Sequence, residues 1–365
     1  MRNASDWSSL LSNASYRVRV ATMSAPLPLH QLETLVAVVD EGGFEAAARR
    51  LHISAPAVSQ RIRALELAVG RTLLQRTVPP VPTDPGERLL PVARRLVLLS
   101  AEAQAAVGLD GAGGDGAGGD GVGGSGPDGT GPGAGRITLP LAVNSDSLDT
   151  WFLDAIASAP DARRTAVHLE RADQDHTAAL LLSGRVVGAV STAAQPVHGC
   201  TSTALGVVRY LPLCTPEFAV AYGLGSAHGP GGPRAGGSRA GGPHTASPHT
   251  AGLATAPRVD YEAGDDLQAG FMRQLLGYSS EPPRHRIPGS IAYVRAVEAG
   301  LGWGLIPEEQ AAPGLRSGHL IPVVPGRFLD VPLFWQRLEL PSATLERFSA
   351  HVVAYAAQRL RPVDS

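Results

Sequence analysis

The residues with the clearest chemical pattern lie near the start of the chain, where arginines gather around short helical segments. Residues 43–76 carry six Arg against Glu45 and Glu66, a local charge of +4 in a chain whose net charge is −2. Guanidinium groups bind phosphates and the edges of guanine bases. Short hydrogen-bonding side chains, Ser59 and Gln60 among them, stand beside these arginines. This combination predicts binding to double-stranded DNA.

Short helices and a tight turn would position these side chains. The spacing of apolar residues predicts a first helix that ends at Gly42-Gly43, then helices over Phe44–Leu51 and Ala55–Val69, separated by the turn His52-Ile53-Ser54. Ser54 is a good N-cap, and Gly70 is expected to end the last of these helices. The segment Thr77–Pro85 holds four prolines and cannot be helical. Two helices, a tight turn and a hairpin describe a winged helix-turn-helix.

In such a motif the second helix enters the major groove. Its side chains that lie away from the expected buried face of Val58, Ile62 and Leu65 would contact DNA, together with an arginine of the hairpin. Arg71 can also reach phosphates. A small helical domain with solvated arginines is the alternative, but pattern, turn length and charge agree on DNA. The candidate DNA-binding residues are Ser54, Pro56, Ala57, Ser59, Gln60, Arg61, Arg63 and Arg76.

A long helix is predicted next, over Gly86–Val107. Leu89 and Leu96 lie on a heptad line, and Leu99 lies on a neighbouring line. An apolar strip of this length needs a partner helix. We therefore expect self-association through Leu89, Leu96 and Leu99.

Three segments are expected to lie outside the folded elements. Residues 1–27 are Ser-rich and aperiodic and are interpreted as a disordered extension, with Met23 as the natural start. Residues 108–135 include three copies of DG[AV]GG and are predicted to be a flexible linker. A calcium-binding repeat is disfavoured because the period is five residues rather than nine. Residues 223–256 form a low-complexity insert rich in Gly, Pro and His.

Strand and helix patterns alternate from Arg136 to the end of the chain. Such alternation predicts two α/β units with largely parallel sheets. The expected strands are ITLPLAVN, AVHLE, VVGAVS, VVRYLPLCT, HRIPGS, GWGLIP and DVPLFWQRL, and the expected helices are 148–159, 175–183, 216–222, 265–276, 291–299 and 343–361.

Polar residues follow several of these strands, and ligands of open α/β sheets bind at such positions. Asp146 could pair with a cationic side chain, and so could Asp265 and Asp266 from the other lobe. For these carboxylates and serines, simple capping of helix N-termini is the alternative. Trp151 is expected in the core or the cleft wall. The candidate ligand-binding residues are Asn144, Ser145, Asp146, Ser147, Trp151, Ser191, Thr192, Asp266 and Ser290.

Several other classes of function are disfavoured. Cys200 and Cys214 suit neither a disulfide scaffold nor a Cys-rich zinc site, and nothing beside them indicates a reactive thiolate. The histidines show no metal-ligand spacing, so no metal or cofactor is expected. Motifs of serine hydrolases, P-loop proteins, zinc proteases and dinucleotide-binding enzymes are not found, so an enzyme is not expected. No apolar run of 18 residues and no secretory h-region is found, and we expect a cytoplasmic protein.

The sequence resembles the LysR-type transcriptional regulators. The resemblance rests on about 65 residues that include AAARRLHISAPAVSQRIRALE. The stretches RTVPPVPT, LAVNSDSLDTW and RVVGAVS are similar to the arginine/lysine-responsive ArgP/LysG subfamily. The resemblance covers Leu29–Val107 and, more loosely, Ile137–Leu360.

This resemblance implies a winged helix-turn-helix, a long dimerising linker helix, and a two-lobed α/β effector domain similar to periplasmic binding proteins. It implies homodimers that pair into tetramers, a dyad-symmetric DNA operator, contact with RNA polymerase, and activation of genes for export or metabolism of Lys or Arg. The expected domains are 1–27 (extension), 28–85 (DNA-binding domain), 86–107 (dimerisation helix), 108–135 (linker), and 136–365 (effector domain, lobe I 136–208 and 339–365, lobe II 209–338).

The linker 108–135 departs from the family pattern, as do the extension 1–22 and the insert 223–256. Flexible residues at 108–135 should weaken a rigid coupling between effector state and DNA. Two other functions stay open, namely a LysR-type regulator of another effector, such as an aromatic acid or a redox signal, and a small-molecule binding protein without a DNA role.

Overall fold

The computed structural model describes residues 26–107, 137–160, 162–172, 174–224, 252–261, 266–277 and 281–363. The chain divides into two compact units, Met1–Val97 and Leu98–Ser365, and the division falls inside one long helix. The linker expected at 108–135 and nearly all of the extension expected at 1–27 lie outside the described residues.

The first unit is a helical domain with a small hairpin, as the sequence predicts. The strands of the hairpin are antiparallel, with Leu74 opposite Pro82. Its core contains Leu35, Val58 and Leu65, all fully buried. The elements, in chain order, are α1 (Leu29–Asp40), α2 (Phe44–Arg50), α3 (Ala55–Val69), β1 (Leu74–Gln75), β2 (Val81–Pro82) and α4 (Asp84–Ala106), whose last residues belong to the second unit.

Local chemistry sets both ends of α3. Ser54 is the N-cap, and its Oγ accepts a hydrogen bond from the backbone N–H of Ala57 at 3.4 Å. Pro56 lies in the first turn, where its missing N–H leaves no helical hydrogen bond unmade. Gly70 ends the helix with φ of 72°, a left-handed conformation that glycine adopts without steric cost. These signals are short-range, which is why the sequence predicts this helix correctly.

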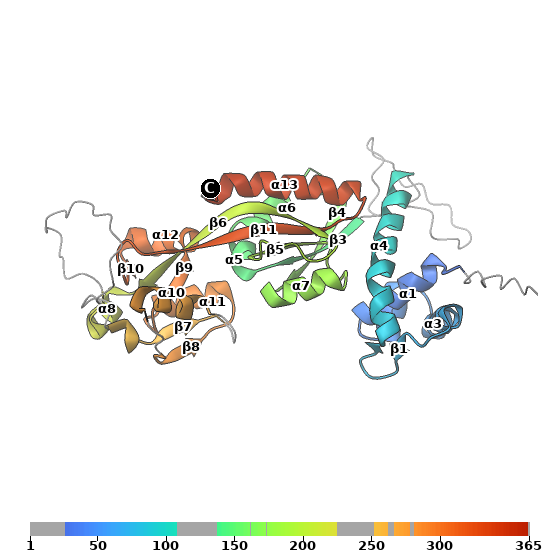
Figure 1. Ribbon diagram of the computed structural model, residues 1–365, viewed down its shortest axis with the longest axis horizontal. Coiled ribbons are helices and arrows are strands. Elements are labelled where there is room, and N and C mark those ends of the chain that lie inside the picture. Colours follow the sequence, from blue (N-terminus) through green and yellow to red (C-terminus); the bar gives the residue numbers. More distant parts are fainter. Residues whose placement is uncertain are drawn as a thin grey trace, which may run out of the picture. The chain divides into compact units, whose positions relative to one another are not determined.

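The second unit is built on one mixed sheet with helices on both faces (Figure 1). Among the described residues this sheet has seven strands in the order β10-β6-β11-β5-β3-β4, with β9 also paired to β6. The elements are β3 (Ile137–Val143), α5 (Ser145–Ser147), η1 (a π-helical turn, Leu148–Phe152), α6 (Leu153–Ala157), β4 (Thr165–Arg171), α7 (Gln174–Leu182), β5 (Gly188–Ser191), β6 (Cys200–Cys214), α8 (Pro216–Tyr222), η2 (Gly252–Ala254), β7 (Arg258–Asp260), α10 (Leu267–Leu276), β8 (Arg284–Arg286), α11 (Ser290–Glu298), β9 (Gly304–Pro307), α12 (Glu308–Ser317), β10 (Ile321–Pro322), β11 (Leu329–Leu338) and α13 (Ala343–Arg359).

The expectation of largely parallel sheets is wrong for most of this sheet. β3 pairs in parallel with β4 and β5, but β11 runs antiparallel to both β5 and β6. β9 and β10 are also antiparallel to β6. The reason is topological, because β11 returns from near the end of the chain and inserts between two strands that alternation alone would place side by side.

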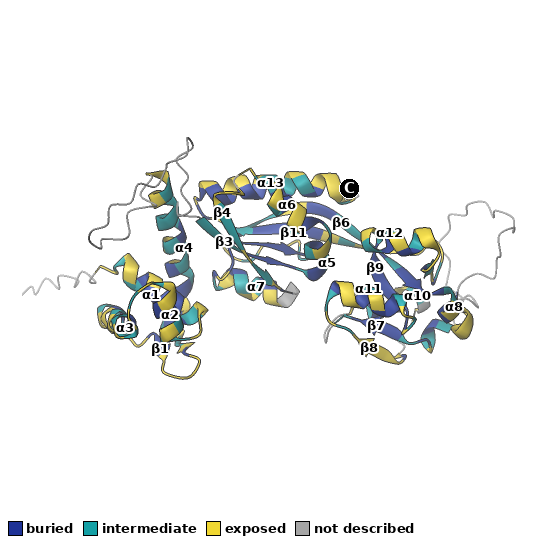
Figure 2. Ribbon diagram, turned by 180° about the vertical axis from the view of Figure 1, so that it is seen from behind, coloured by how far each residue is buried: buried dark blue, intermediate teal, exposed yellow. Residues whose placement is uncertain are grey.

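The unit has two lobes with separate cores, which the long strands β6 and β11 connect (Figure 2). The core of lobe I contains Trp151, Trp335 and Phe348, and lobe II has two apolar clusters, one around Trp303 and one around Tyr293. Leu333, Trp335 and Leu338 of β11 pack in the lobe I core, although they fall within the range 209–338 expected for lobe II. A strand pattern does not show where the strand passes from one core to the next.

Two further differences come from packing that is distant in sequence. α12 is a helix that the sequence analysis misses, because Pro313 and Gly314 lie inside it. Leu224, Leu253 and Ala256 are buried in lobe II, so the insert expected at 223–256 is too wide at both ends. Residues 225–251 lie outside the described residues.

Candidate nucleic-acid interface and ligand cleft

The outer surface of α3 carries most of the residues expected to contact DNA. Val58, Ile62 and Leu65 are buried against the first unit's core, so the remaining positions of the helix face outward. Of the candidates, Ser54, Pro56, Gln60, Arg63 and Arg76 are exposed, and Ala57, Ser59 and Arg61 are half-buried. The structure thus places polar and cationic side chains together on one accessible helix, the arrangement that reading of a major groove requires.

Glu66 fixes the hairpin to the end of α3, a role that the sequence analysis misses. Its Oε1 accepts hydrogen bonds from the backbone N–H groups of Leu73 at 2.9 Å and Leu74 at 3.3 Å. Both leucines are buried. One carboxylate therefore holds β1, the first strand of the wing, against the helix expected to enter the DNA groove. Helical spacing alone does not reveal a contact made seven or eight residues away with backbone groups.

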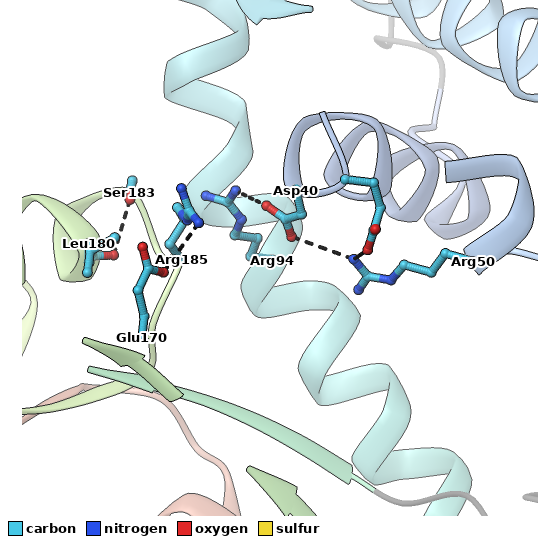
Figure 3. Close-up of polar contacts among 8 residues, drawn as sticks. Asp40, Arg50, Arg94, Glu170, Leu180, Ser183 and Arg185 are labelled. Atoms are coloured by element: carbon cyan, nitrogen blue, oxygen red, sulfur yellow. Dashed lines mark hydrogen bonds and ion pairs between the residues drawn. The ribbon is translucent and has the colours of Figure 1, made fainter. Parts of the chain in front are cut away.

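A second carboxylate connects α4 to the rest of the first unit (Figure 3). Asp40, at the end of α1, forms an ion pair with Arg94 of α4 and lies 3.9 Å from Arg50 of α2. Arg50 also donates to Glu41 Oε1 at 3.2 Å. The Arg94 side chain is only 9% exposed, which makes this a semi-buried pair rather than a solvated one. It sets where α4 leaves the helix-turn-helix.

The strip expected to drive dimerisation is only partly accessible within one chain. Leu96 is 43% exposed and Val92, one turn earlier, is 50% exposed. Leu89 is half-buried against the first unit's core. Leu99 packs against the core of lobe I, so it is less available to a partner helix than expected. Val92 and Leu96 are therefore the large apolar side chains of this helix that are exposed for contact with a partner helix.

In the second unit, Asp146 brings both lobes together. The Tyr210 hydroxyl donates to Asp146 Oδ2 at 2.6 Å, and the Ser290 hydroxyl donates to Asp146 Oδ1 at 2.7 Å. Asp146 follows β3 in lobe I, whereas Tyr210 and Ser290 belong to lobe II. The Asp146 carboxylate therefore joins the two lobes through hydroxyl groups of lobe II.

Two more hydrogen bonds support this junction. Ser145 and Tyr261 share a hydrogen bond of 2.6 Å between their hydroxyls, again across the lobes. Gln310 Nε2 donates to the Ser290 hydroxyl at 2.9 Å. Tyr210, Tyr261 and Gln310 are absent from the sequence-based candidates. Their partners are 20 to 116 residues away along the chain, and no local motif marks them.

An open groove lies beside Asp146, with a volume of about 520 Å³. Ser290, which contacts Asp146, is part of its wall. The groove receives residues from both lobes, since Asp149 lies on η1 and Arg171 ends β4, while Gly289 precedes α11 and the others lie on that helix. The lining residues are Asp149, Arg171, Gly289, Ser290, Ile291, Ala292 and Arg295. Asp146 is not among these lining residues and contacts the groove wall at Ser290.

Other expected ligand-binding residues lie differently. Trp151 is 1% exposed and packs edge-on against Phe152, with ring centroids 5.4 Å apart, so it supports the core and is too buried to touch a ligand. Ser147 is fully buried, and neither its hydroxyl nor Asn144 Oδ1 has a hydrogen-bond partner among the described residues. Both stand close to Asp146 in sequence, but their burial favours a structural place.

The remaining candidates lie at the end of β5 and before α10. Ser191 is buried, and its hydroxyl accepts from the backbone N–H of Ala193 at 3.1 Å. Thr192 is half-buried beside it. Asp266 is exposed and precedes α10 without capping it through its side chain. Asp265 lies outside the described residues.

The two cysteines are unsuited to a thiol switch. Both are buried, and burial raises the pKa of the Cys214 thiol to about 12. They are the first and last residues of β6, a 15-residue strand, which separates them by on the order of 40 Å. A disulfide needs Cα atoms within about 7 Å. A redox-sensing pair is therefore disfavoured.

Within the ranges that the structure covers, no group of three or more His, Cys, Asp or Glu side chains could hold a metal ion. The described helices include none that is long and apolar enough to cross a membrane.

Comparison with known proteins gives consistent matches. Residues 29–87 match the family model described as bacterial regulatory helix-turn-helix protein, lysR family. The lysine export transcriptional regulatory protein LysG of Corynebacterium efficiens is 36% identical over 92% of this chain and 99% of its own. The crystal structure of ArgP from Mycobacterium tuberculosis has a TM-score of 0.69 at 33% identity and covers 91% of this chain and 98% of its own. Full-length LysG from Corynebacterium glutamicum with bound effector Arg has a TM-score of 0.61 at 34% identity, over 92% of this chain and 100% of its own.

Proposed function

This chain belongs to the LysR family of bacterial transcriptional regulators, in its LysG/ArgP branch, and from that premise we propose that it senses a basic amino acid, Lys or Arg. The amino acid would bind in the cleft of the second unit, and the DNA operator would bind to α3 and its wing. The protein has no enzymatic role in this proposal.

The observation that carries the effector proposal is the position of Asp146. Its carboxylate lies at the junction of the lobes and contacts Ser290, which lines a solvent-open groove. A cationic side chain that enters a partly desolvated site needs an anionic partner, and a charge-assisted hydrogen bond to a carboxylate supplies it. The related LysG structure with bound Arg supports the same class of ligand. The residues proposed to line this site are Ser145, Asp146 and Ser290, with Asp266 a second-choice acidic partner.

On the DNA side, the proposal rests on the accessible face of α3. Ser59, Gln60 and Arg61 would contact base edges, and Arg63 and Arg76 would contact phosphates. Exposed Leu96 and Val92 on α4 are proposed to pack against a second copy, which would present two such helices to the half-sites of a dyad operator. Pairing of dimers into tetramers and contact with RNA polymerase are expected from the family.

The output we infer is activation of genes for export or metabolism of the amino acid, as the name of the LysG relative indicates for that protein. Because the operator is chromosomal DNA, we place this regulator in the cytoplasm. An aromatic-acid effector is the alternative. Asp146 disfavours it, since a carboxylate at the cleft junction would repel an acidic ligand.

The test is the binding of Lys, Arg and His to full-length wild type and to Asp146→Asn, measured by calorimetry. A charge-assisted hydrogen bond contributes about 1.5–3 kcal/mol, so the variant should bind Lys or Arg roughly 10- to 150-fold more weakly. Asp154→Asn is the matched control, because Asp154 is exposed on the same helical segment.

DNA binding without effector should be unchanged in Asp146→Asn, since α3 belongs to the other unit. If wild type releases no heat with Lys, Arg or His, the proposal of a basic amino acid is wrong. Equal binding by wild type and Asp146→Asn would move the cation contact to another residue.

A further inference from the structure

Three charged side chains from three different elements line the groove beside Asp146. Asp149 comes from η1 and Arg171 from the last position of β4, both in lobe I, and Arg295 comes from α11 in lobe II. None of them is among the residues expected from the sequence to bind a ligand. Each is exposed, and the three together give the groove a charge of +1.

These three side chains have no protein partner within the described part of the second unit, whereas several other arginines of that unit are paired. Arg209 pairs with Asp330 at 2.7 Å, Arg258 with Asp260 at 2.9 Å, and Arg361 with Glu308 at 2.6 Å. Among the described residues, no hydrogen bond or ion pair engages the side chain of Asp149, Arg171 or Arg295. Two like charges that line one groove repel each other, and an anion between them relieves that repulsion.

We propose that Arg171 and Arg295 form an anion subsite for the α-carboxylate of the effector, with Asp149 receiving its α-ammonium group. The guanidinium fork matches the two oxygens of a carboxylate, which makes arginine the residue suited to this task. Asp146 and Asp149 are three residues apart on one helical segment, and Ser290, which contacts Asp146, lines the same groove as Asp149. A ligand whose side-chain cation contacts Asp146 therefore has its backbone end within the reach of Asp149 and the two arginines.

This assignment rests on the proposed function and adds the way in which the site selects its ligand. It requires both ends of the molecule: a cation for Asp146, and an intact amino-acid head for Asp149, Arg171 and Arg295. A diamine such as cadaverine keeps the cation but lacks the carboxylate. L-norleucine keeps the amino-acid head but lacks the side-chain cation. Both should bind more weakly than L-lysine, each for a different reason.

The experiment is calorimetry on the full-length protein with L-lysine, cadaverine and L-norleucine as probes. Arg171→Gln and Arg295→Gln are compared with wild type, and Arg316→Gln, an exposed arginine of α12 outside the groove, serves as the control. We expect wild type and the control to bind L-lysine at least 10-fold more tightly than cadaverine. In Arg171→Gln and Arg295→Gln the affinity for L-lysine should fall about 10-fold or more, while that for cadaverine stays unchanged or rises.

Two results would overturn the anion subsite: wild-type affinity for L-lysine in both arginine variants, or an equal loss of affinity for L-lysine and cadaverine. If L-lysine binding depends on Asp146 but on neither arginine, the proposed function stands and this inference is wrong. If L-norleucine binds as tightly as L-lysine and needs the arginines, the anion subsite stands and the basic-amino-acid proposal is wrong. A wild type that binds none of the three probes overturns both.

Discussion

Replacement of Glu66 tests whether one carboxylate holds the wing to the DNA-reading helix. Its Oε1 accepts two backbone N–H groups, from Leu73 at 2.9 Å and Leu74 at 3.3 Å, and both leucines are buried. A hydrogen bond to a charged group contributes about 1.5–3 kcal/mol, and the longer second bond contributes less. Glu66→Ala should therefore lower the free energy of unfolding of the first unit by about 2–4 kcal/mol. For a domain of this size that corresponds to a fall in Tm of roughly 8–30 °C.

The position of the tryptophans allows the two units to be followed separately. Trp151, Trp303 and Trp335 all lie in the second unit, and Trp7 lies outside the described residues. Thermal unfolding of the full-length protein should show a far-ultraviolet circular dichroism transition that moves to lower temperature in Glu66→Ala, while the tryptophan fluorescence transition stays in place. Glu66→Gln keeps one uncharged acceptor and should fall between the two.

The matched control is Glu33→Ala, because Glu33 is an exposed glutamate on α1 of the same unit. It should change stability by less than about 0.5 kcal/mol. The reasoning would be refuted if Glu66→Ala were as stable as this control, or if the tryptophan transition fell equally.

Other perturbations address the DNA surface, self-association and the buried thiol. Arg61→Ala should weaken operator binding by about 1–3 kcal/mol if the guanidinium contacts a base edge. If it contacts a phosphate, the slope of log binding constant against log salt concentration should become shallower by about one. Fluorescence anisotropy at several salt concentrations separates these two cases, and unchanged affinity at every salt concentration would show that Arg61 does not contact DNA. Leu96 is 43% exposed on α4, and Leu96→Asp should abolish dimers in sedimentation and, with them, tight operator binding. A variant that stays dimeric would show that this strip does not form the dimer interface. Since burial raises the pKa of Cys214 from 9.0 to about 12, the unfolded chain loses this proton first as pH rises, so stability should fall between about pH 9 and 12, and Cys214→Ala should lack that part of the fall.

The sequence determined the features that depend on neighbouring residues. The ends of α3 follow from Ser54, Pro56 and Gly70, each of which acts within one helical turn. Its buried face follows from Val58, Ile62 and Leu65 at helical spacing. The DNA-binding character could therefore be predicted, because the chemistry of a helix surface is set by the same short segment that forms the helix.

The ligand cleft could be predicted only in part. Asp146 is recognisable because it lies three residues after an apolar strand, near the strand end where ligands of α/β sheets bind. Its partners are not recognisable, since Tyr210 lies 64 residues away and Ser290 144 residues away. Arg171 and Arg295 also come from different lobes. Only the tertiary fold brings such residues together, and their positions in the sequence do not indicate that they are close in space.

Strand order and helix interruptions were also decided by tertiary structure. β11 enters between β5 and β6 and makes the sheet mixed, a choice made by packing of the finished sheet rather than by any strand alone. α12 forms in spite of Gly314 because that glycine lies against Leu320, where a Cβ would come within 2.7 Å of the leucine Cδ1. A residue that disfavours a helix locally is thus required there by a side chain that packs against it. Local residue preference determines a helix or strand only where packing against residues distant in sequence does not require another residue type.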